Sequence, residues 1–152
     1  MTDATLLQRR APAGWTLIEL MIGLAVVALL ITLSYPGFQS VVLRIHRGDA
    51  VSTLAQVQLQ QQRYRSNRSS FATLGELGVP HTTPGGRYRL QDQAPPTATG
   101  FLVIASARGA QMADLPCTHL LLEVTGAETR IASGPDADVT NGETDNQRCW
   151  GR

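Results

Sequence analysis

The sequence predicts an α+β fold in which a long N-terminal α-helix, first transmembrane and then amphipathic, packs on a small antiparallel β-sheet of about four strands. Three observations predict this fold. An unbroken apolar run stands near the N-terminus, the residues after it carry apolar side chains at helical spacing, and four short β-rich segments follow. The chain has 152 residues, enough for one domain with one small core.

The apolar run occupies residues 15–38 and follows a polar stretch, residues 1–14, that contains Arg9 and Arg10. No charged side chain occurs from Leu20 to Leu33, and with its flanks this run approaches the ~20 residues that span a bilayer. Because basic residues before a span stay in the cytoplasm, the N-terminus is expected on the cytoplasmic side.

Two alternatives compete for this segment. An ordinary secretory signal needs a small-residue cleavage site after the apolar run, and residues 34–40 show no such pattern. A plain signal anchor leaves Glu19, at the edge of the run, unexplained. An acid inside hydrocarbon costs on the order of 3 kcal/mol and usually marks a function.

The helix is expected to begin near Thr16, because Thr16 and Glu19 form a capping-box pattern, and to run to about Arg65. Pro36 removes one backbone hydrogen bond and predicts a kink. The alternative is that the helix ends at Pro36 and a loop begins.

Residues 39–65 are the predicted amphipathic half of this helix. The apolar stripe follows a spacing of four and three residues: Ala50, Leu54, Val57, Gln61 and Tyr64, widened by Val51, Ala55 and Leu59. The opposite, polar face holds Arg47, Asp49, Ser52, Gln56, Gln60 and Arg63.

Residues 66–152 are the predicted extracytoplasmic β-domain. Polar turn formers at 66–70 end the helix, and strands are expected at 88–91, 101–107, 120–125 and 129–132. Residues 126–128 predict a hairpin loop. One face of such a small sheet needs a cover, which the helix stripe can supply.

Charge is balanced overall, at +1, so it predicts no bulk attraction to nucleic acid or acidic lipid. It is uneven along the chain, since residues 40–90 hold seven arginines against two acids, and residues 109–152 hold seven acids against three arginines. Such a subunit can pack head-to-tail on its own copies. The alternative is that both parts are solvated surfaces.

No enzyme chemistry is predicted. His46, His81 and His119 lie far apart in the sequence, and no nucleophile, phosphate-loop or dinucleotide motif occurs. The chain has no Cys/His cluster, so no metal site and no cofactor are expected. Calcium bound by the acidic stretch Asp136–Asp145 is the alternative, because alternate oxygens at this spacing can bind it.

Residues 14–20, GWTLIEL, resemble the G-F-T-L-I-E-L signature of type IV pilins and pseudopilins. The resemblance implies the type IV pilin fold and cleavage by a prepilin peptidase between Gly14 and Trp15, which removes residues 1–14 as a leader. Trp15, which replaces the usual Phe, would then be N-methylated. Glu19 would pair with the freed amine of a neighbouring subunit during assembly, and Pro36 falls where pilins carry their helix kink.

The stretch SFATLGELG and the ending Cys149-Trp150 resemble minor pilins of the PilE type. The resemblance implies a structural subunit of a type IV pilus, or fimbrium, that takes part in assembly, twitching motility and cell adhesion. Its partners would be other pilin subunits, the prepilin peptidase and the pilus assembly platform. It would sit in the inner membrane as a single-pass protein, and then in the periplasm or the extracellular pilus.

The two cysteines, Cys117 and Cys149, both follow the apolar run. If the run crosses the membrane outward, both reach an oxidising compartment, where a disulfide is expected. The resemblance to pilins also implies a C-terminal disulfide loop. The alternative is a pair of buried free thiols.

Two other functions share the N-terminal features. One is a pseudopilin of a type II secretion system. The other is a DNA-binding pilin for natural transformation, in which Arg65, Arg87 and Arg89 contact phosphates or a partner subunit within a basic, partly aromatic patch. That patch would also include Tyr64, Arg68 and Tyr88.

Overall fold

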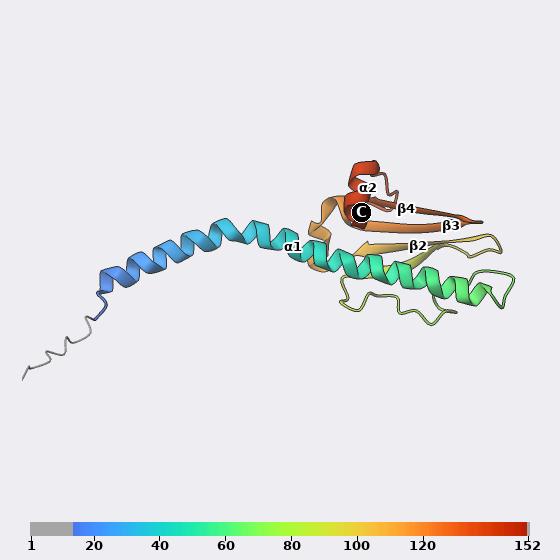
Figure 1. The fold of residues 1–152 in the computed structure, drawn as a ribbon, viewed down its shortest axis with the longest axis horizontal. Helices are drawn as coiled ribbons and strands as arrows, with labels where there is room; N and C mark the ends of the chain where they lie inside the picture. The colour runs from blue at the N-terminus through green and yellow to red at the C-terminus, as the bar shows by residue number, and fades with distance from the viewer. Residues whose placement is uncertain (1–13, 152) are drawn as a thin grey trace, which may run out of the picture. The chain divides into compact units, whose positions relative to one another are not determined.

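The computed structural model describes residues 14–151 (Figure 1). Its elements, in chain order, are α1 (Leu17–Arg65), β1 (Tyr88–Ala94), β2 (Gly100–Ala107), the 3-10 helices η1 (Gly109–Ala113) and η2 (Leu115–Cys117), β3 (His119–Thr125), β4 (Glu128–Gly134) and α2 (Glu143–Trp150). The predicted α+β class and the four strands are confirmed. Contacts divide the chain into an N-terminal unit, Met1–Phe38, and a globular unit, Gln39–Arg152.

The sheet is antiparallel throughout, with the strands in the order β1-β2-β3-β4. Each strand therefore pairs with the next one in the sequence. The β3–β4 connection is a two-residue hairpin, because Thr125 pairs with Glu128 and Gly126 has φ 63°. Positive φ in such short hairpins matches the twist of the strands, and Gly adopts it without steric cost.

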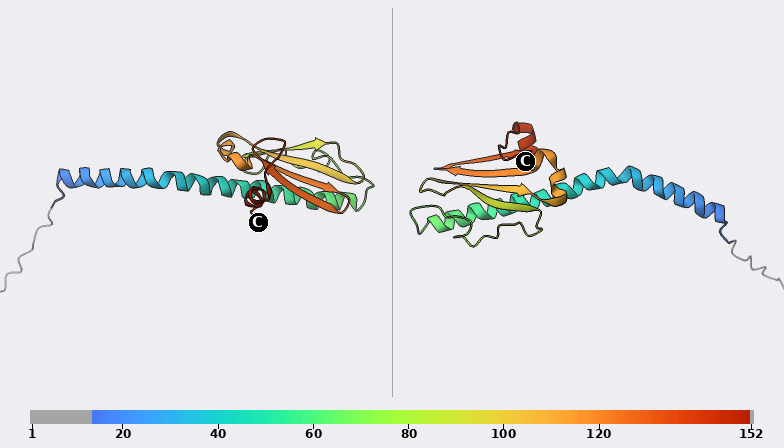
Figure 2. Two further views of the ribbon diagram at one scale, coloured as in Figure 1. Left: turned by 90° about the horizontal axis from the view of Figure 1, so that it is seen from above. Right: turned by 180° about the vertical axis from the view of Figure 1, so that it is seen from behind.

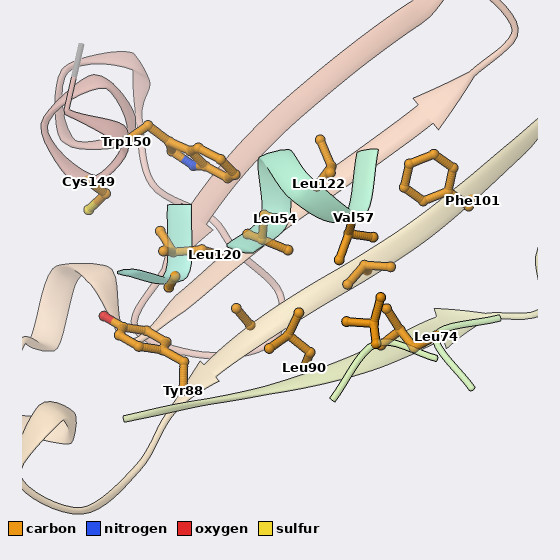
Figure 3. Close-up of a cluster of buried hydrophobic side chains, with 14 of the residues drawn as sticks. Leu54, Val57, Leu74, Tyr88, Leu90, Phe101, Leu120, Leu122, Cys149 and Trp150 are labelled. Carbon is orange, nitrogen blue, oxygen red and sulfur yellow. The ribbon is translucent and has the colours of Figure 1, made fainter. Parts of the chain in front are cut away.

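The second half of α1 covers one face of this sheet (Figure 2). Leu54 and Val57 of α1 are 0% and 1% exposed, and in Figure 3 they lie among side chains of the sheet such as Leu90 and Leu122. Leu74, from the segment after the helix, belongs to the same cluster. The apolar stripe predicted for this half of the helix is thus the main core contact.

Gln61 continues the stripe although it is polar, and it is fully buried. Its amide nitrogen donates to the carbonyl oxygen of Ala72 at 2.5 Å, and its amide oxygen accepts from the backbone N–H of Ala72 at 2.9 Å. Burial of a satisfied amide is tolerated. The widened stripe is wrong at Ala55 and Leu59, which are exposed.

A smaller apolar cluster covers the other face of the sheet. It consists of Ile104, Leu121, Ala132 and Val139, with Leu102 packed against it. Val139 has φ 47°, which is uncommon for a β-branched residue. A Cβ added at Gly134 would lie 2.6 Å from the Cα of Val139, so glycine is what allows the chain after β4 to fold back over the sheet.

The last element expected from the sequence is the strand at 129–132, but the structure has a further helix after it. Helix α2 occupies Glu143–Trp150 and ends at Gly151, whose φ of 70° is left-handed. Trp150 is buried, and its indole N–H donates to the carbonyl of Ala132 at 3.0 Å. The predicted disulfide between Cys117 and Cys149 is confirmed and ties α2 to η2.

Candidate functional site

The N-terminal start of α1 is a capping box. The backbone N–H and the hydroxyl of Thr16 both donate to Oε2 of Glu19 at 3.0 Å, and the Thr16 hydroxyl accepts from the Glu19 N–H at 3.2 Å. These contacts satisfy groups that the first helical turn otherwise leaves without partners. Among the described residues, Oε1 of Glu19 has no hydrogen-bond partner, so it remains available to another group.

The apolar side chains at the start of α1 are exposed to solvent in the structure. Every large apolar side chain from Leu17 to Leu33 is exposed, and Trp15 is 78% exposed. By length and composition, α1 fits a membrane span: its most apolar stretch has a mean hydropathy of 2.5 and none of it is buried. A helix that is apolar all round needs lipid or other helices around it.

The helix continues through position 36, so the alternative that it ends there and a loop begins is wrong. The side chain of Pro36 lies outside the described residues, and the kink at Pro36 stays a prediction. Residues 1–13, which make up most of the predicted leader, are likewise outside the described range. The predicted cleavage site, Gly14 and Trp15, stands at its edge.

Three exposed arginines gather at the C-terminal end of α1 and are called the tip arginines: Arg63, Arg65 and Arg68. The guanidinium carbon of Arg65 lies 4.7 Å from the centre of the Phe71 ring, and that of Arg68 lies 5.1 Å from the centre of the Tyr64 ring. Such stacking holds a cation by its attraction to the ring face while its N–H edges stay free.

A groove of about 400 Å³ opens beside Arg65, one of the tip arginines. Its walls combine amide, hydroxyl, cationic and aromatic groups, and no carboxylate lines it; they include Gln58, Gln62, Arg65, Phe71, Phe101 and Thr129. None of the tip arginines forms an ion pair with a carboxylate of the described residues. Arg68 affects one carboxylate without forming an ion pair with it: its positive charge makes a small contribution to lowering the pKa of Glu76.

Glu76 repeats the capping box of Glu19 within the globular unit. Its carboxylate accepts from the N–H and the hydroxyl of Thr73 at 2.8 and 2.9 Å. These two hydrogen bonds, with a smaller contribution from Arg68, lower the pKa of Glu76. The two boxes have the same local geometry, and only that of Glu19 lies at the start of an apolar helix.

The structure does not bring Arg65 together with Arg87 and Arg89. The turn before Arg87 packs against α1 near Asp49, because a Cβ at Gly85 would lie 3.2 Å from the Asp49 carboxylate. Asp49 precedes Arg65 by 16 positions, or about 24 Å of helix at 1.5 Å per residue. The predicted patch is therefore divided between two ends of the globular unit.

Tyr88, the other aromatic residue of that patch, is not on the surface. It is fully buried, whereas Arg89 next to it is exposed, as the alternation of a strand requires. The Tyr88 hydroxyl donates to the carbonyl of Cys117 at 3.3 Å. Burial, above all, raises the pKa of Tyr88 to about 12.

A buried ion pair joins α1 to the segment between β2 and β3. Nε of Arg47 lies 2.9 Å from Oδ2 of Asp114, and its second guanidinium nitrogen lies 3.1 Å from Oδ1. Arg47 also donates to the carbonyl of Arg148 in α2 at 2.9 Å. Arg47, assigned to the polar face opposite the apolar stripe, is buried, because an acid far along the chain pairs with it inside the fold.

Gln111 completes this network. Its amide nitrogen lies within hydrogen-bond distance of the Leu43 carbonyl (3.1 Å), the Tyr88 hydroxyl (3.1 Å) and Asp114 Oδ2 (3.2 Å). One amide thus links α1, β1 and η1. Sequence reasoning did not find this network, since no local pattern marks residues that are 67 positions apart.

The acidic stretch Asp136–Asp145 does not fold as one loop. Asp136 accepts the N–H of Asp138 at 3.1 Å, whereas Glu143 and Asp145 lie in the first turn of α2. Asn141 is turned inward and donates to the Pro116 carbonyl at 2.5 Å. Within residues 14–151 no three His, Cys, Asp or Glu side chains are grouped to hold a metal ion.

Helix α2 was also missed, although the sequence carries a signal for it. Two acids stand in its first turn, Arg148 in its last turn and Gly151 just after it. Acids at the N-terminus, a base at the C-terminus and a following glycine are recognised helix signals. An apolar stripe is the stronger signal of a helix, and this short helix has only the buried pair Cys149 and Trp150.

Comparison with known protein families gives two matches. The family described as "Type IV minor pilin ComP, DNA uptake sequence receptor" matches residues 36–121, more than half of the chain. The prokaryotic N-terminal methylation motif matches residues 9–35, which include Gly14, Trp15 and Glu19. No curated protein matches the chain.

These matches agree with the geometry: an apolar helix after a methylation motif, continued by an amphipathic half under a four-stranded sheet. They favour a pilus subunit over a pseudopilin of a secretion system. They also give ComP as the family, whereas the sequence resemblance points to minor pilins of the PilE type. The chain belongs to the type IV minor pilin family ComP and is a structural subunit of a type IV pilus.

Proposed function

We propose that this minor pilin is a non-enzymatic subunit that is anchored through residues 15–38 and contacts DNA through its tip arginines. The observation that carries the proposal is the set of three exposed guanidinium groups at the end of α1, two of them seated on aromatic rings and none paired with a carboxylate of the described residues. The family description, a receptor for a DNA uptake sequence, supports it.

In this proposal Glu19 pairs with the N-terminal amine of a neighbouring subunit. A prepilin peptidase would cut between Gly14 and Trp15, and Trp15 would then be N-methylated. The freed amine is positive at neutral pH. Oε2 of Glu19 is occupied by Thr16, and Oε1 has no partner among the described residues, so Oε1 is available for the amine of a neighbouring subunit.

Pairing of this kind selects a register. An unpaired charge among apolar helices is costly, whereas a paired charge is tolerated. A neighbouring subunit that is shifted along the helix would leave both charges without a partner. Glu19 would therefore set the axial position of the neighbouring subunit, and would add little to the stability of the assembled pilus.

The assembly test compares charge with capping. Glu19→Gln keeps a side chain that can cap Thr16 but removes the charge, and Glu19→Ala removes both. We expect both variants to be processed but to enter pili poorly, measured by quantifying the subunit in sheared pili. The matched control is Glu76→Ala, which removes the same capping box from the globular unit and should enter pili normally.

Mass spectrometry of the mature subunit tests the processing step separately. The expected N-terminus is an N-methylated Trp15. A subunit that begins at Met1, or Glu19→Ala subunits that enter pili as efficiently as the parent, would contradict the assembly role of these residues.

The subunit would occupy different locations before and after assembly. Before assembly it would cross the inner membrane once, with its N-terminus in the cytoplasm, where the prepilin peptidase and the pilus assembly platform receive it. After assembly the globular unit would face outward and serve twitching motility and adhesion. The proposed function uses no cofactor and no catalytic residue.

In this proposal the tip arginines contact the phosphates of DNA. Arginines that are free of carboxylate partners can neutralise phosphates and release counterions, which gives sequence-independent affinity. Aromatic rings under two of them hold the guanidinium groups in place, so less freedom is lost on binding. The adjoining groove offers the amides of Gln58 and Gln62 for further polar contacts.

The DNA test uses the purified full chain in detergent and a labelled duplex, followed by fluorescence anisotropy over a range of salt concentrations. Each of Arg63→Ala, Arg65→Ala and Arg68→Ala should weaken binding and reduce the slope of log K against log salt by about 0.9 for each phosphate that the variant no longer neutralises. The control is Arg130→Ala, because Arg130 is exposed but already paired with Glu123.

The double variant Arg87→Ala/Arg89→Ala separates the two ends of the globular unit. If the tip binds DNA, this variant keeps the parental salt slope. A reduced slope in this variant, with an unchanged slope in the tip variants, would move the DNA contact to the other end. Absence of any duplex binding would remove the DNA role and leave the pilus role untouched.

A further inference from the structure

The exposed apolar side chains of the globular unit gather at one end. Val41 and Ile45 on α1 are 52% and 63% exposed, and Met112 and Leu115, in and after η1, are 60% and 68% exposed. Among the described residues of this unit, Leu59 is the one other large apolar side chain that is similarly exposed. We call the segments 41–47 and 108–117 together the base.

Specific contacts hold the two segments of the base together. Gln111 donates to the carbonyl of Leu43 at 3.1 Å, and the Arg47–Asp114 ion pair lies inside at 2.9 Å. Apolar groups are therefore presented from both segments on a fixed framework. Exposure of several large apolar side chains at one place usually marks an interaction site.

The exposed charges of the base are positive. Arg44 and Arg108 are exposed, whereas Arg47 and Asp114 are buried and neutralise each other. On α1, Val41, Arg44 and Ile45 have the spacing of one helix face. Apolar side chains interleaved with arginines are the pattern by which proteins lie in the interface of an anionic membrane.

The chain enters the globular unit at this end. Only Gln39 and Ser40 separate Phe38, the last residue of the apolar segment, from Val41. If residues 15–38 are in a bilayer, so short a connection keeps the first turns of the globular unit at the membrane surface. A lipid surface is therefore the partner that the base meets first.

We propose that the base is a membrane-contact surface: Val41, Ile45, Met112 and Leu115 enter the interface, and Arg44 and Arg108 contact anionic headgroups while the subunit awaits assembly. The contact holds the globular unit against the bilayer. It is released when the subunit leaves the membrane. The inference rests on the anchoring by residues 15–38 that the proposed function contains.

The test uses the full chain reconstituted in vesicles of phosphatidylglycerol and phosphatidylcholine that contain a lipid quencher in the headgroup region. Both cysteines of the chain form the disulfide, so a single added cysteine can be labelled. Fluorophores are placed at Leu115→Cys in the base, and at Leu59→Cys and Ala127→Cys as exposed controls. The Leu115 probe should be blue-shifted and quenched, and the two controls should not.

Two changes should reduce the quenching at position 115: the double variant Arg44→Ala/Arg108→Ala, and vesicles of phosphatidylcholine alone. Equal quenching at positions 115, 59 and 127 would overturn the proposal. So would a probe at position 115 that lipid does not quench and that shifts only at high protein-to-lipid ratios, because the base would then contact a neighbouring subunit.

A fourth probe, Leu30→Cys, with a quencher in the acyl chains, reports the anchoring itself. If it is quenched while the Leu115 probe is not, the base proposal fails and the anchoring stands. If the Leu30 probe is not quenched, the anchoring fails, and the two failures are thereby distinguished.

Discussion

The two halves of α1 have the same backbone structure and opposite surroundings. From Leu17 to Leu33 every large apolar side chain is exposed, as in Leu30 at 58%. From Ala50 to Gln61 one stripe is buried to 1% exposure or less, as in Leu54. Helix formation by itself therefore does not decide what a helix packs against. The distribution of apolar residues around the helix decides it.

The first half is apolar all round, so no single face can satisfy it, and it needs lipid or several neighbouring helices. The second half buries one face on the sheet and keeps a polar face in water. Mutations should therefore alter the stability of the globular unit when they fall in the second half, and leave it unchanged when they fall in the first.

The largest expected effect comes from the buried ion pair in the second half. Arg47→Ala leaves Asp114 buried with Gln111 as its remaining hydrogen-bond donor, so the free energy of unfolding should fall by about 3–5 kcal/mol. Denaturant unfolding of the full chain in detergent measures it, in a Trp15→Phe background so that the fluorescence reports Trp150. Arg130→Ala is the control, because its partner Glu123 is partly solvated and the loss should stay below about 1 kcal/mol.

Removal of the disulfide should have the next largest effect. The double variant Cys117→Ala/Cys149→Ala opens a loop of 32 residues and should lower the free energy of unfolding by roughly 3–4 kcal/mol. The helicity of the apolar half, measured by circular dichroism in detergent, should not change. A parallel loss of helicity there would show that the two halves are not energetically separate.

A matched pair of leucines tests the comparison most directly. Leu54→Ala creates a cavity under the sheet and should lower the free energy of unfolding of the globular unit by about 3 kcal/mol, within the range of 2–5 for such changes. Leu30→Ala makes the same chemical change at an exposed site and should leave this free energy unchanged. Similar losses in the two variants, measured by the same unfolding titration, would contradict the division.

The smallest effect is a dependence on pH that belongs to the buried half. The pKa of Tyr88 is raised from 10.0 to about 12, so the folded state holds the neutral phenol more strongly than the unfolded state does. Stability from this group is complete below about pH 10 and is lost as pH rises toward 12, by at most about 2–3 kcal/mol. In Tyr88→Phe this part of the alkaline decline should be absent. An identical decline in both proteins would show that Tyr88 is not its cause.

Much of the fold could be predicted because its signals are local. The capping box at Thr16, the stripe through Leu54 and the hairpin at Gly126 each depend on neighbours within a few residues, and the structure contains all three. The four strands were expected at 88–91, 101–107, 120–125 and 129–132, and each lies within the observed strand. Periodicity predicts these elements well because period two and period 3.6 are properties of the backbone itself.

The candidate sites were predicted less completely. The N-terminal motif could be found because its residues are adjacent. The arginines could not be grouped correctly, because Arg65 belongs to the end of α1 whereas Arg87 and Arg89 belong to a turn and a strand at the other end of the unit. Distance in space between segments depends on how the sheet docks on the helix, and spacing in the sequence does not report it.

By itself the sequence determined the extent of the long helix, the division of its surface into an apolar and an amphipathic half, and the four strands. These depend on the order of residue types over short stretches. Only the tertiary structure decided that Arg47 is buried, and that the chain after Ser133 covers the sheet and ends in α2. It also decided that the tip arginines lie apart from the exposed arginines of the base. Each of these depends on which distant segment excludes water from a given side chain, and burial of that kind is a property of the whole fold.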